Sequence, residues 1–375
     1  MNAPAHPGVS AGGTQGGRIA RIDFWPLRIP LRHPFVISLG RLDCAENVAV
    51  RIETASGLAG YGECSPFRTI NGESVATACA VAADLKTCLL GLDALDIGAC
   101  VRRMDAVFHG NSSVKSAFDI ALHDLAAQAA GLPLHALLGG GRVRTTPLLT
   151  DYTVSLGGVD EMAAEAAALA ARGFPAIKVK LGGTLDDDLC RVRAVRAAVL
   201  RTIPLRLDAN QGWSFETAIR LLAQLGGMNI EFCEEPIPRW DFMRLAQVRQ
   251  ASAVPVMADE SCSDEHDLRR LIDLGACDCV NIKLGKSGGL HRARTMVRMA
   301  EAAGIKLQIG GFLESRLAIT ASAHLAMISD SIAWCDFDEP LMHAEDPVRG
   351  GLVYGPGGVM TLPDGPGLGA SLPFS

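Results

Sequence analysis

The chain has 375 residues, of which 49% are hydrophobic, and a formal net charge of −6. This length exceeds one typical core, which predicts two domains or one barrel with an added domain. The sequence contains no basic stripe and no apolar run of roughly 18 residues, so it argues against a nucleic-acid partner and against a membrane span.

Residues 1–17 are small, polar and rich in Gly and Pro, with no apolar signal-peptide stretch, so we expect a disordered leader. The 11 cysteines are scattered through apolar segments, which is typical of free thiols in a reducing cytoplasm. Cys277 and Cys279 have the spacing of a metal-binding pair, but no second Cys or His pair matches them. We therefore interpret both as packing residues.

Residues 18–142 have the pattern of an α+β domain. Within 18–65, apolar and polar residues alternate, as at Val48, Val50 and Ile52, which predicts antiparallel strands with a turn. Segments 73–105 and 114–138 are rich in helix formers and predict helices.

Residues 143–338 alternate short apolar runs with amphipathic helical stretches. Eight such repeats predict a parallel (β/α)₈ barrel. The residues that end successive runs recur at intervals of 24 to 30 residues; they are Lys178, Asp208, Glu234, Asp259, Lys283, Gly310 and Asp336. They should lie at the C-terminal rim of the barrel, where active sites of this fold are built. We expect residues 339–375 to pack back on the N-terminal domain.

Three acidic residues, Asp208, Glu234 and Asp259, end consecutive predicted strands and should converge at the rim. Three carboxylates this close need a cation, and oxygen ligands favour Mg²⁺, with Mn²⁺ as an alternative. The other interpretation is that they cap the helices that follow. Glu235 competes with Glu234 as a ligand, but only one of two successive side chains faces the barrel interior.

Lys178 and Lys180 are two positions apart, so both should face the barrel interior. Crowding of two ammonium groups should lower the pKa of each, which would suit Lys180 as a general base. Lys283 lies on the sixth predicted strand, diametrically opposite the second, so it should face Lys180. Lys286 is its competitor but falls in the loop beyond the strand. A surface pair on a twisted strand end is the alternative for Lys178 and Lys180.

These groups together predict a mechanism. The metal would polarise a substrate carboxylate, and one lysine would remove the α-proton. The metal and Lys178 would hold the enediolate, while the opposite lysine returned a proton to the other face and so produced the epimer.

The motifs IKVK, RLDANQGW, EEP, ADES and NIKLGKSGG, in this order, resemble the muconate-lactonizing-enzyme subgroup of the enolase superfamily. The resemblance covers roughly residues 18–370 and implies that the N-terminal domain caps the barrel. It agrees with the Lys-and-Mg²⁺ chemistry of such sites.

Within the subgroup the chain is most similar to the dipeptide epimerases, through TDYTVS, HPFVIS and CDFDEPLM. The resemblance implies that Asp336 and Asp338 bind the free ammonium of a dipeptide. It implies that Thr153 contacts the substrate and that Lys178 binds the metal-bound carboxylate. The alternative for the two aspartates is a strand-end cap.

One departure concerns the capping loop. Ala-Glu epimerases carry an arginine after the Pro-Phe segment, whereas Leu39 and Gly40 stand there in this chain and Arg41 follows. Either the loop shifts so that Arg41 grips a glutamate, or the second residue of the dipeptide is apolar or larger, which we favour. Phe312 and Leu313 are expected to shape the same pocket.

Other reactions through the same intermediate are the enzymatic alternatives, namely o-succinylbenzoate synthesis, N-acylamino-acid racemisation and cycloisomerisation. Their substrates lack a free ammonium, so Asp336 and Asp338 disfavour them. A non-catalytic binding barrel is the remote alternative. The resemblance also implies a homo-oligomer, and we expect a cytoplasmic location.

Overall fold

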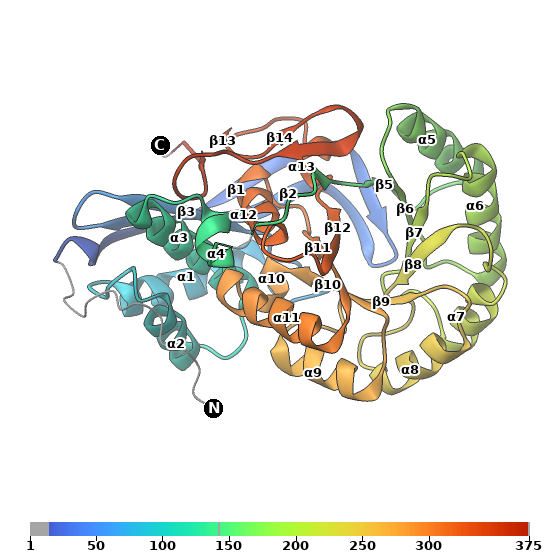
Figure 1. Cartoon of the computed structure of the whole chain (residues 1–375), viewed down its shortest axis with the longest axis horizontal. Helices are drawn as coiled ribbons and strands as arrows, with labels where there is room; N and C mark the ends of the chain where they lie inside the picture. Colours follow the sequence, from blue (N-terminus) through green and yellow to red (C-terminus); the bar gives the residue numbers. More distant parts are fainter. Residues whose placement is uncertain (1–14, 142, 374–375) are drawn as a thin grey trace.

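The computed structural model describes residues 15–373 apart from residue 142. An N-terminal sheet with helices sits beside a barrel of parallel strands, and the C-terminal segment runs across both (Figure 1). Within the described part of the chain, no helix is long and apolar enough to cross a membrane. Residues 1–14 of the expected leader lie outside the described residues, whereas Gln15–Gly17 form the 3₁₀ turn η1.

The N-terminal part is the α+β unit that the alternating pattern predicts. Its antiparallel sheet has the order β1-β2-β3. Helix α3 packs directly on β3, because a Cβ at Gly62 would lie 1.9 Å from the carbonyl oxygen of Ala117. The elements are β1 (Ile19–Ile37), β2 (Gly40–Thr54), β3 (Ala59–Cys64), α1 (Val75–Leu89), α2 (Ile97–Val107), α3 (Ser112–Ala130) and α4 (Leu134–Gly139).

The predicted parallel barrel is confirmed. Eight strands follow one another in the order β5 to β12. A parallel bridge from Thr150, just before β5, to Cys335 on β12 brings the first and last strands together. The strands are β5 (Tyr152–Val154), β6 (Ile177–Lys180), β7 (Leu205–Asp208), β8 (Ile230–Glu234), β9 (Val256–Ala258), β10 (Cys279–Lys283), β11 (Lys306–Gly310) and β12 (Ile332–Asp336).

Helices cover the outside of the barrel (Figure 1). They are α5 (Val159–Ala171), α6 (Leu185–Ala198), α7 (Phe215–Leu222), α8 (Phe242–Ala251), α9 (Glu265–Leu274), α10 (Leu284–Ser287), α11 (Leu290–Ala303) and α12 (Arg316–Ala326). The eighth repeat differs from the others, because β12 is followed by the short helix α13 (Glu339–Met342).

The C-terminal segment contacts both parts. Leu368 N–H donates to Asp124 Oδ1 on α3 at 2.8 Å, and Leu134 N–H donates to the carbonyl of Gly367 at 2.9 Å. Its elements, with the short strand that pairs with them, are β4 (Leu148–Leu149), β13 (Arg349–Gly350), β14 (Val353–Tyr354), η2 (Pro356–Gly358), β15 (Val359–Thr361) and β16 (Ala370–Ser371).

The tip of the β1–β2 hairpin reaches the C-terminal rim of the barrel. Ser38 Oγ donates to the carbonyl oxygen of Asn210 at 2.7 Å, and Leu156 N–H donates to that of Val36 at 3.0 Å. Figure 1 shows the hairpin, in blue, extending toward β5 and β6. The hairpin therefore forms a wall over the end of the barrel at which the polar strand ends lie.

Candidate active site

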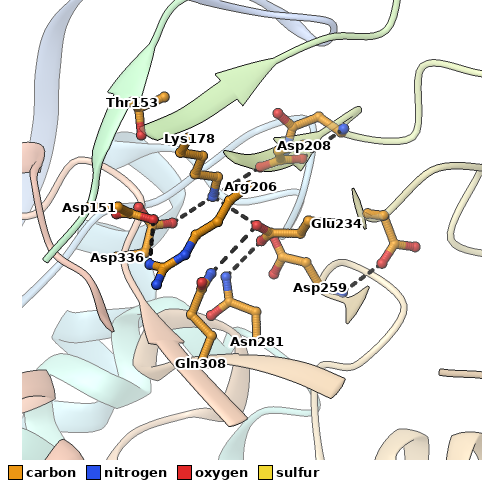
Figure 2. Close-up of polar contacts among 12 residues, drawn as sticks. Asp151, Thr153, Lys178, Arg206, Asp208, Glu234, Asp259, Asn281, Gln308 and Asp336 are labelled. Carbon is orange, nitrogen blue, oxygen red and sulfur yellow. Dashed lines mark hydrogen bonds and ion pairs between the residues drawn. The ribbon is translucent and has the colours of Figure 1, made fainter. Parts of the chain in front are cut away.

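Lys178 lies at the centre of a buried polar network in the barrel mouth (Figure 2). Its Nζ is 2.6 Å from Asp336 Oδ2, 2.8 Å from Glu234 Oε2 and 3.1 Å from Asp208 Oδ2. The side chain is only 1% exposed. The ammonium is stable there because three carboxylates replace its hydration shell.

Lys180 and Lys283 project from β6 and β10. These are the second and sixth strands of the barrel and therefore lie on opposite sides of it. Lys180 Nζ lies 2.7 Å from Asp208 Oδ2, and Lys283 Nζ lies 2.8 Å from Asp259 Oδ2. Each ammonium also faces an aromatic ring, that of Phe35 at 5.6 Å for Lys180 and that of Phe312 at 5.0 Å for Lys283. The two lysines thus have matching environments on opposite sides of the mouth.

Asp208 and Glu234 end β7 and β8, while Asp259 is the first residue beyond β9. All three are fully buried. Glu234 accepts a hydrogen bond from Asn281 Nδ2 at 2.7 Å, inside the barrel. Glu235 instead accepts from the N–H of Asp259 at 2.7 Å, so it positions the neighbouring strand end.

Lys286, the competitor of Lys283, is also buried, at 4% exposed. Its Nζ contacts Asp259 Oδ1 at 2.5 Å and the carbonyl of Asn281 at 3.0 Å. The cavity in the barrel mouth is lined by Lys178, Lys180 and Lys283 but not by Lys286. Lys286 therefore contacts Asp259 from outside the cavity.

The expected lowering of the pKa by crowding is wrong for Lys178. Burial lowers the pKa of Lys178, but Asp336, Glu234 and Asp208 raise it by more, so the net shift is upward. The pKa of Lys283 is likewise raised, because Asp259 and Glu234 outweigh its burial. Carboxylates from other strands of the barrel therefore outweigh the crowding of the two ammonium groups.

The three carboxylates fit a hard divalent cation in donor chemistry, since all offer oxygen at adjacent strand ends. Over the part of the chain that the structure describes, no three His, Cys, Asp or Glu side chains are gathered closely enough to hold a metal as they stand. Lysine ammonium groups lie between the carboxylates instead. Lys178 contacts oxygens of both Asp208 and Glu234, so a metal and this ammonium compete for the same atoms.

Asp336 and Asp338 both line the cavity, at the end of β12 and just beyond it. Asp336 accepts from Lys178, and Asp338 Oδ2 accepts from the backbone N–H of Thr153 at 2.6 Å. Thr153 is the middle residue of β5 and is 4% exposed. The first and last strands of the barrel thus bring together three of the predicted substrate-binding residues, namely Thr153, Asp336 and Asp338.

The capping loop forms a second cavity, of about 210 Å³, beside the first. Ile37 and Phe67 line both cavities, and Leu313 lines the second. Arg41 lies at its edge, pairs with Asp43 at 2.8 Å and is 62% exposed. Its guanidinium therefore already has a carboxylate partner at the surface.

Several residues of the site were missed by the sequence analysis. Asn210 Oδ1 accepts from Lys180 Nζ at 3.1 Å, and Asn281 holds Glu234. Deeper in the barrel, Arg206 pairs with Asp151 at 2.8 Å (Figure 2). Three of these residues, Arg206, Asn281 and Asp151, lie two positions before a predicted site residue. The two-residue periodicity of a strand, applied once more toward its N-terminus, would have predicted them.

Comparison with known families matches both parts of the chain. Residues 23–139 match the mandelate racemase / muconate lactonizing enzyme N-terminal domain. Residues 161–373 match the enolase C-terminal domain-like family.

Similar proteins of known activity cover nearly the whole chain. The D-Ala-D/L-Ala epimerase of Cytophaga hutchinsonii is 51% identical over 94% of this chain and 95% of its own length. The structure of a dipeptide epimerase from that organism, complexed with Mg and D-Ala-L-Val, has a TM-score of 0.93 at 50% identity and covers 95% of this chain and 96% of that one.

More distant relatives differ in substrate. The substrate-liganded L-Ala-D/L-Glu epimerase of Bacillus subtilis is 37% identical, with a TM-score of 0.91 and coverage of 94% and 98%. The N-succinyl-L-Arg/Lys racemase of Bacillus cereus is 33% identical over 95% of each chain. By fold, motifs and identity, this chain belongs to the enolase superfamily, in the dipeptide epimerase family of its muconate-lactonizing-enzyme subgroup.

Proposed function

We propose that the protein is a Mg²⁺-dependent isomerase that epimerises dipeptides at the α-carbon beside the C-terminal carboxylate. The observation that carries the proposal is the placement of Lys180 and Lys283 on opposite strands of the barrel. Each is buried and each is paired with a different carboxylate. A planar intermediate between them has one lysine side chain on each face, which is the arrangement that inversion at carbon requires.

The residues divide the work as follows. One of the lysines Lys180 and Lys283 removes the α-proton as its neutral amine, and the other delivers a proton to the opposite face. Lys178 binds the substrate carboxylate through its ammonium. When bound at Asp208, Glu234 and Asp259, Mg²⁺ supplies positive charge that stabilises negative charge on the substrate carboxylate.

Asp336, Asp338 and Thr153 form the proposed site for the free amino group. Two carboxylates on one wall of the cavity suit a cation and disfavour an N-acylated substrate. This supports a dipeptide over the N-acylamino-acid racemase, o-succinylbenzoate synthase and cycloisomerase alternatives. The N-succinyl-L-Arg/Lys racemase is also less similar to this chain than the Cytophaga epimerase.

The second residue of the dipeptide is proposed to be apolar. Leu39, Leu42 and Leu313 line the capping cavity, and Arg41, the arginine that follows the Pro-Phe segment, is paired with Asp43. The names of two relatives support the choice, since the more similar one is an Ala-Ala epimerase and the less similar one an Ala-Glu epimerase.

The test is to incubate the Mg²⁺-loaded protein with a library of L,L-dipeptides in D₂O and to follow α-deuterium incorporation by mass spectrometry. We expect exchange with L-Ala-L-Ala and L-Ala-L-Val, and weaker exchange with L-Ala-L-Glu. The Lys180→Ala/Lys283→Ala double variant is the control and should give no exchange. If no dipeptide exchanges, the proposed function is wrong.

We also propose that the protein forms a homo-oligomer and is located in the cytoplasm. All 11 cysteines are free, Cys277 and Cys279 included, which supports a reducing compartment. Light scattering coupled to size-exclusion chromatography measures the assembly, and a monomer mass would contradict the homo-oligomer.

A further inference from the structure

A third carboxyl group faces the cavity that Asp336 and Asp338 line. Glu339 begins helix α13, directly after Asp338, and is 5% exposed. It lines the same cavity as Lys178 and the two aspartates. Its Oε2 is buried and has no hydrogen-bond partner among the described residues. Buried carboxyl oxygens are nearly always hydrogen-bonded, so this atom points to a donor that the protein itself does not supply.

The two aspartates differ from Glu339 in this respect. Asp336 Oδ2 already accepts from Lys178 Nζ, and Asp338 Oδ2 already accepts from the N–H of Thr153, both at 2.6 Å. A cationic group that enters the cavity therefore meets two partly satisfied carboxylates and one unsatisfied carboxyl group. The contact with this cationic group should therefore stabilise Glu339 more than either aspartate.

Gly311 leaves the space that Glu339 occupies. A Cβ at this position would lie 2.7 Å from Glu339 Oε1 and 2.9 Å from Glu314 Oε2. Two carboxyl groups thus approach the same point on the wall of the cavity. Burial and the neighbouring charges of Asp336 and Asp338 raise the pKa of Glu339 well above its ordinary value. The pKa of Glu314 is raised to about 7, chiefly by burial.

We propose that Glu339 is the third acceptor for the substrate's free ammonium, beside Asp336 and Asp338. This inference rests on the proposed dipeptide substrate. A primary ammonium has three N–H donors, and the three side chains offer one acceptor each from a single wall. The ammonium also brings the positive charge that favours the ionised form of Glu339, whereas the amide of an N-acylated substrate brings none.

The test compares two ligands that differ only in the amino group. L-alanyl-L-alanine and propionyl-L-alanine are titrated by calorimetry into the Mg²⁺-loaded wild type and into Glu339→Gln, which keeps the shape of the side chain and removes its charge. We expect Glu339→Gln to weaken binding of the dipeptide by about 10- to 100-fold, the range for a hydrogen bond to a charged group. Binding of propionyl-L-alanine should be unchanged or tighter.

The matched control is Glu345→Gln, the same substitution at an exposed position six residues further along. It should leave both affinities as in the wild type. Because the two ligands are compared on one variant, an effect that does not depend on the amino group would weaken binding of both.

Three outcomes overturn the inference. Glu339→Gln could bind the dipeptide as tightly as the wild type, it could lose affinity for both ligands equally, or the wild type could bind neither ligand. Failure of the proposed function looks different: the wild type would bind the dipeptide more tightly than propionyl-L-alanine yet incorporate no α-deuterium.

Discussion

At the scale of single residues, the two opposed lysines have equivalent surroundings. Lys180 and Lys283 each contact one strand-end carboxylate and one aromatic ring, that of Phe35 or Phe312. Phe35 comes from the capping hairpin and Phe312 from the loop after β11. Each ring shields one ammonium from solvent. Epimerisation in both directions requires that each lysine can act as the base for one epimer.

Removing one lysine should therefore affect the two substrate epimers unequally. Lys180→Ala is expected to lower α-deuterium exchange from one epimer by about 10²- to 10⁴-fold, the usual contribution of a general base, and Lys283→Ala to do so for the other. Exchange is measured separately on L,L- and L,D-dipeptides. Lys306→Ala removes an exposed lysine as the control. Equal losses for both epimers in each variant would contradict the two-face mechanism.

At the scale of elements, a capping-domain side chain holds a barrel helix. Glu63 on β3 accepts from the N–H of Ser315 at 2.9 Å and from that of Ala318 at 3.3 Å, at the start of α12. An acidic group at a helix N-terminus is favourable because it meets free N–H donors and the positive end of the helix dipole. Asn47 joins Glu63 to the carbonyl oxygen of Leu313, at 2.7 and 3.0 Å. The loop that lines both cavities is therefore fixed by the other domain.

The substitution Glu63→Gln tests this contact. An amide offers one acceptor oxygen, so either Ala318 N–H or the Asn47 and Ser315 donors would face an NH₂ group. We expect the free energy of unfolding to fall by about 1–3 kcal/mol, the cost of an unsatisfied buried donor. Urea unfolding followed by circular dichroism measures it, with exposed Glu46→Gln as the control. Stability equal to that of the wild type would show that the helix needs no such acceptor.

At the scale of the whole molecule, the barrel mouth holds more buried acidic residues than buried cationic ones. The buried acidic residues there are Asp151, Asp208, Glu234, Glu235, Asp259, Glu260, Glu314, Asp336, Asp338 and Glu339. The buried cationic residues are Lys178, Lys180, Arg206, Lys283 and Lys286. Such an imbalance is costly in a low-dielectric interior, and a divalent cation together with a substrate ammonium reduces it.

A divalent cation should therefore stabilise the fold. At a Mg²⁺ concentration 100 times its Kd, linkage adds about 2.7 kcal/mol to the free energy of unfolding. Thermal melts in Mg²⁺ and in EDTA measure the effect. Asp208→Asn should abolish the response, whereas Asp160→Asn, at an exposed position on α5, should retain it. Identical melting temperatures with and without Mg²⁺ in the wild type would argue against the assigned ligands.

The local pattern of the sequence predicts much of the fold and of the candidate site. Apolar runs repeating every 24 to 30 residues predicted the barrel, because each strand and helix carries its own periodicity. The same phase put Asp208, Glu234 and Asp259 at strand ends, and a spacing of two paired Lys178 with Lys180 and Asp336 with Asp338.

Tertiary structure alone decided the rest, because it depends on which distant segments meet. The carboxylates around Lys178 come from three other strands, and they raise its pKa where local crowding predicted a fall. Arg41 turned out to be paired at the surface, and Glu63 to reach α12 across the domain boundary. The unsatisfied oxygen of Glu339 could be recognised only once every neighbour was in place, since a missing partner has no local signature in the sequence.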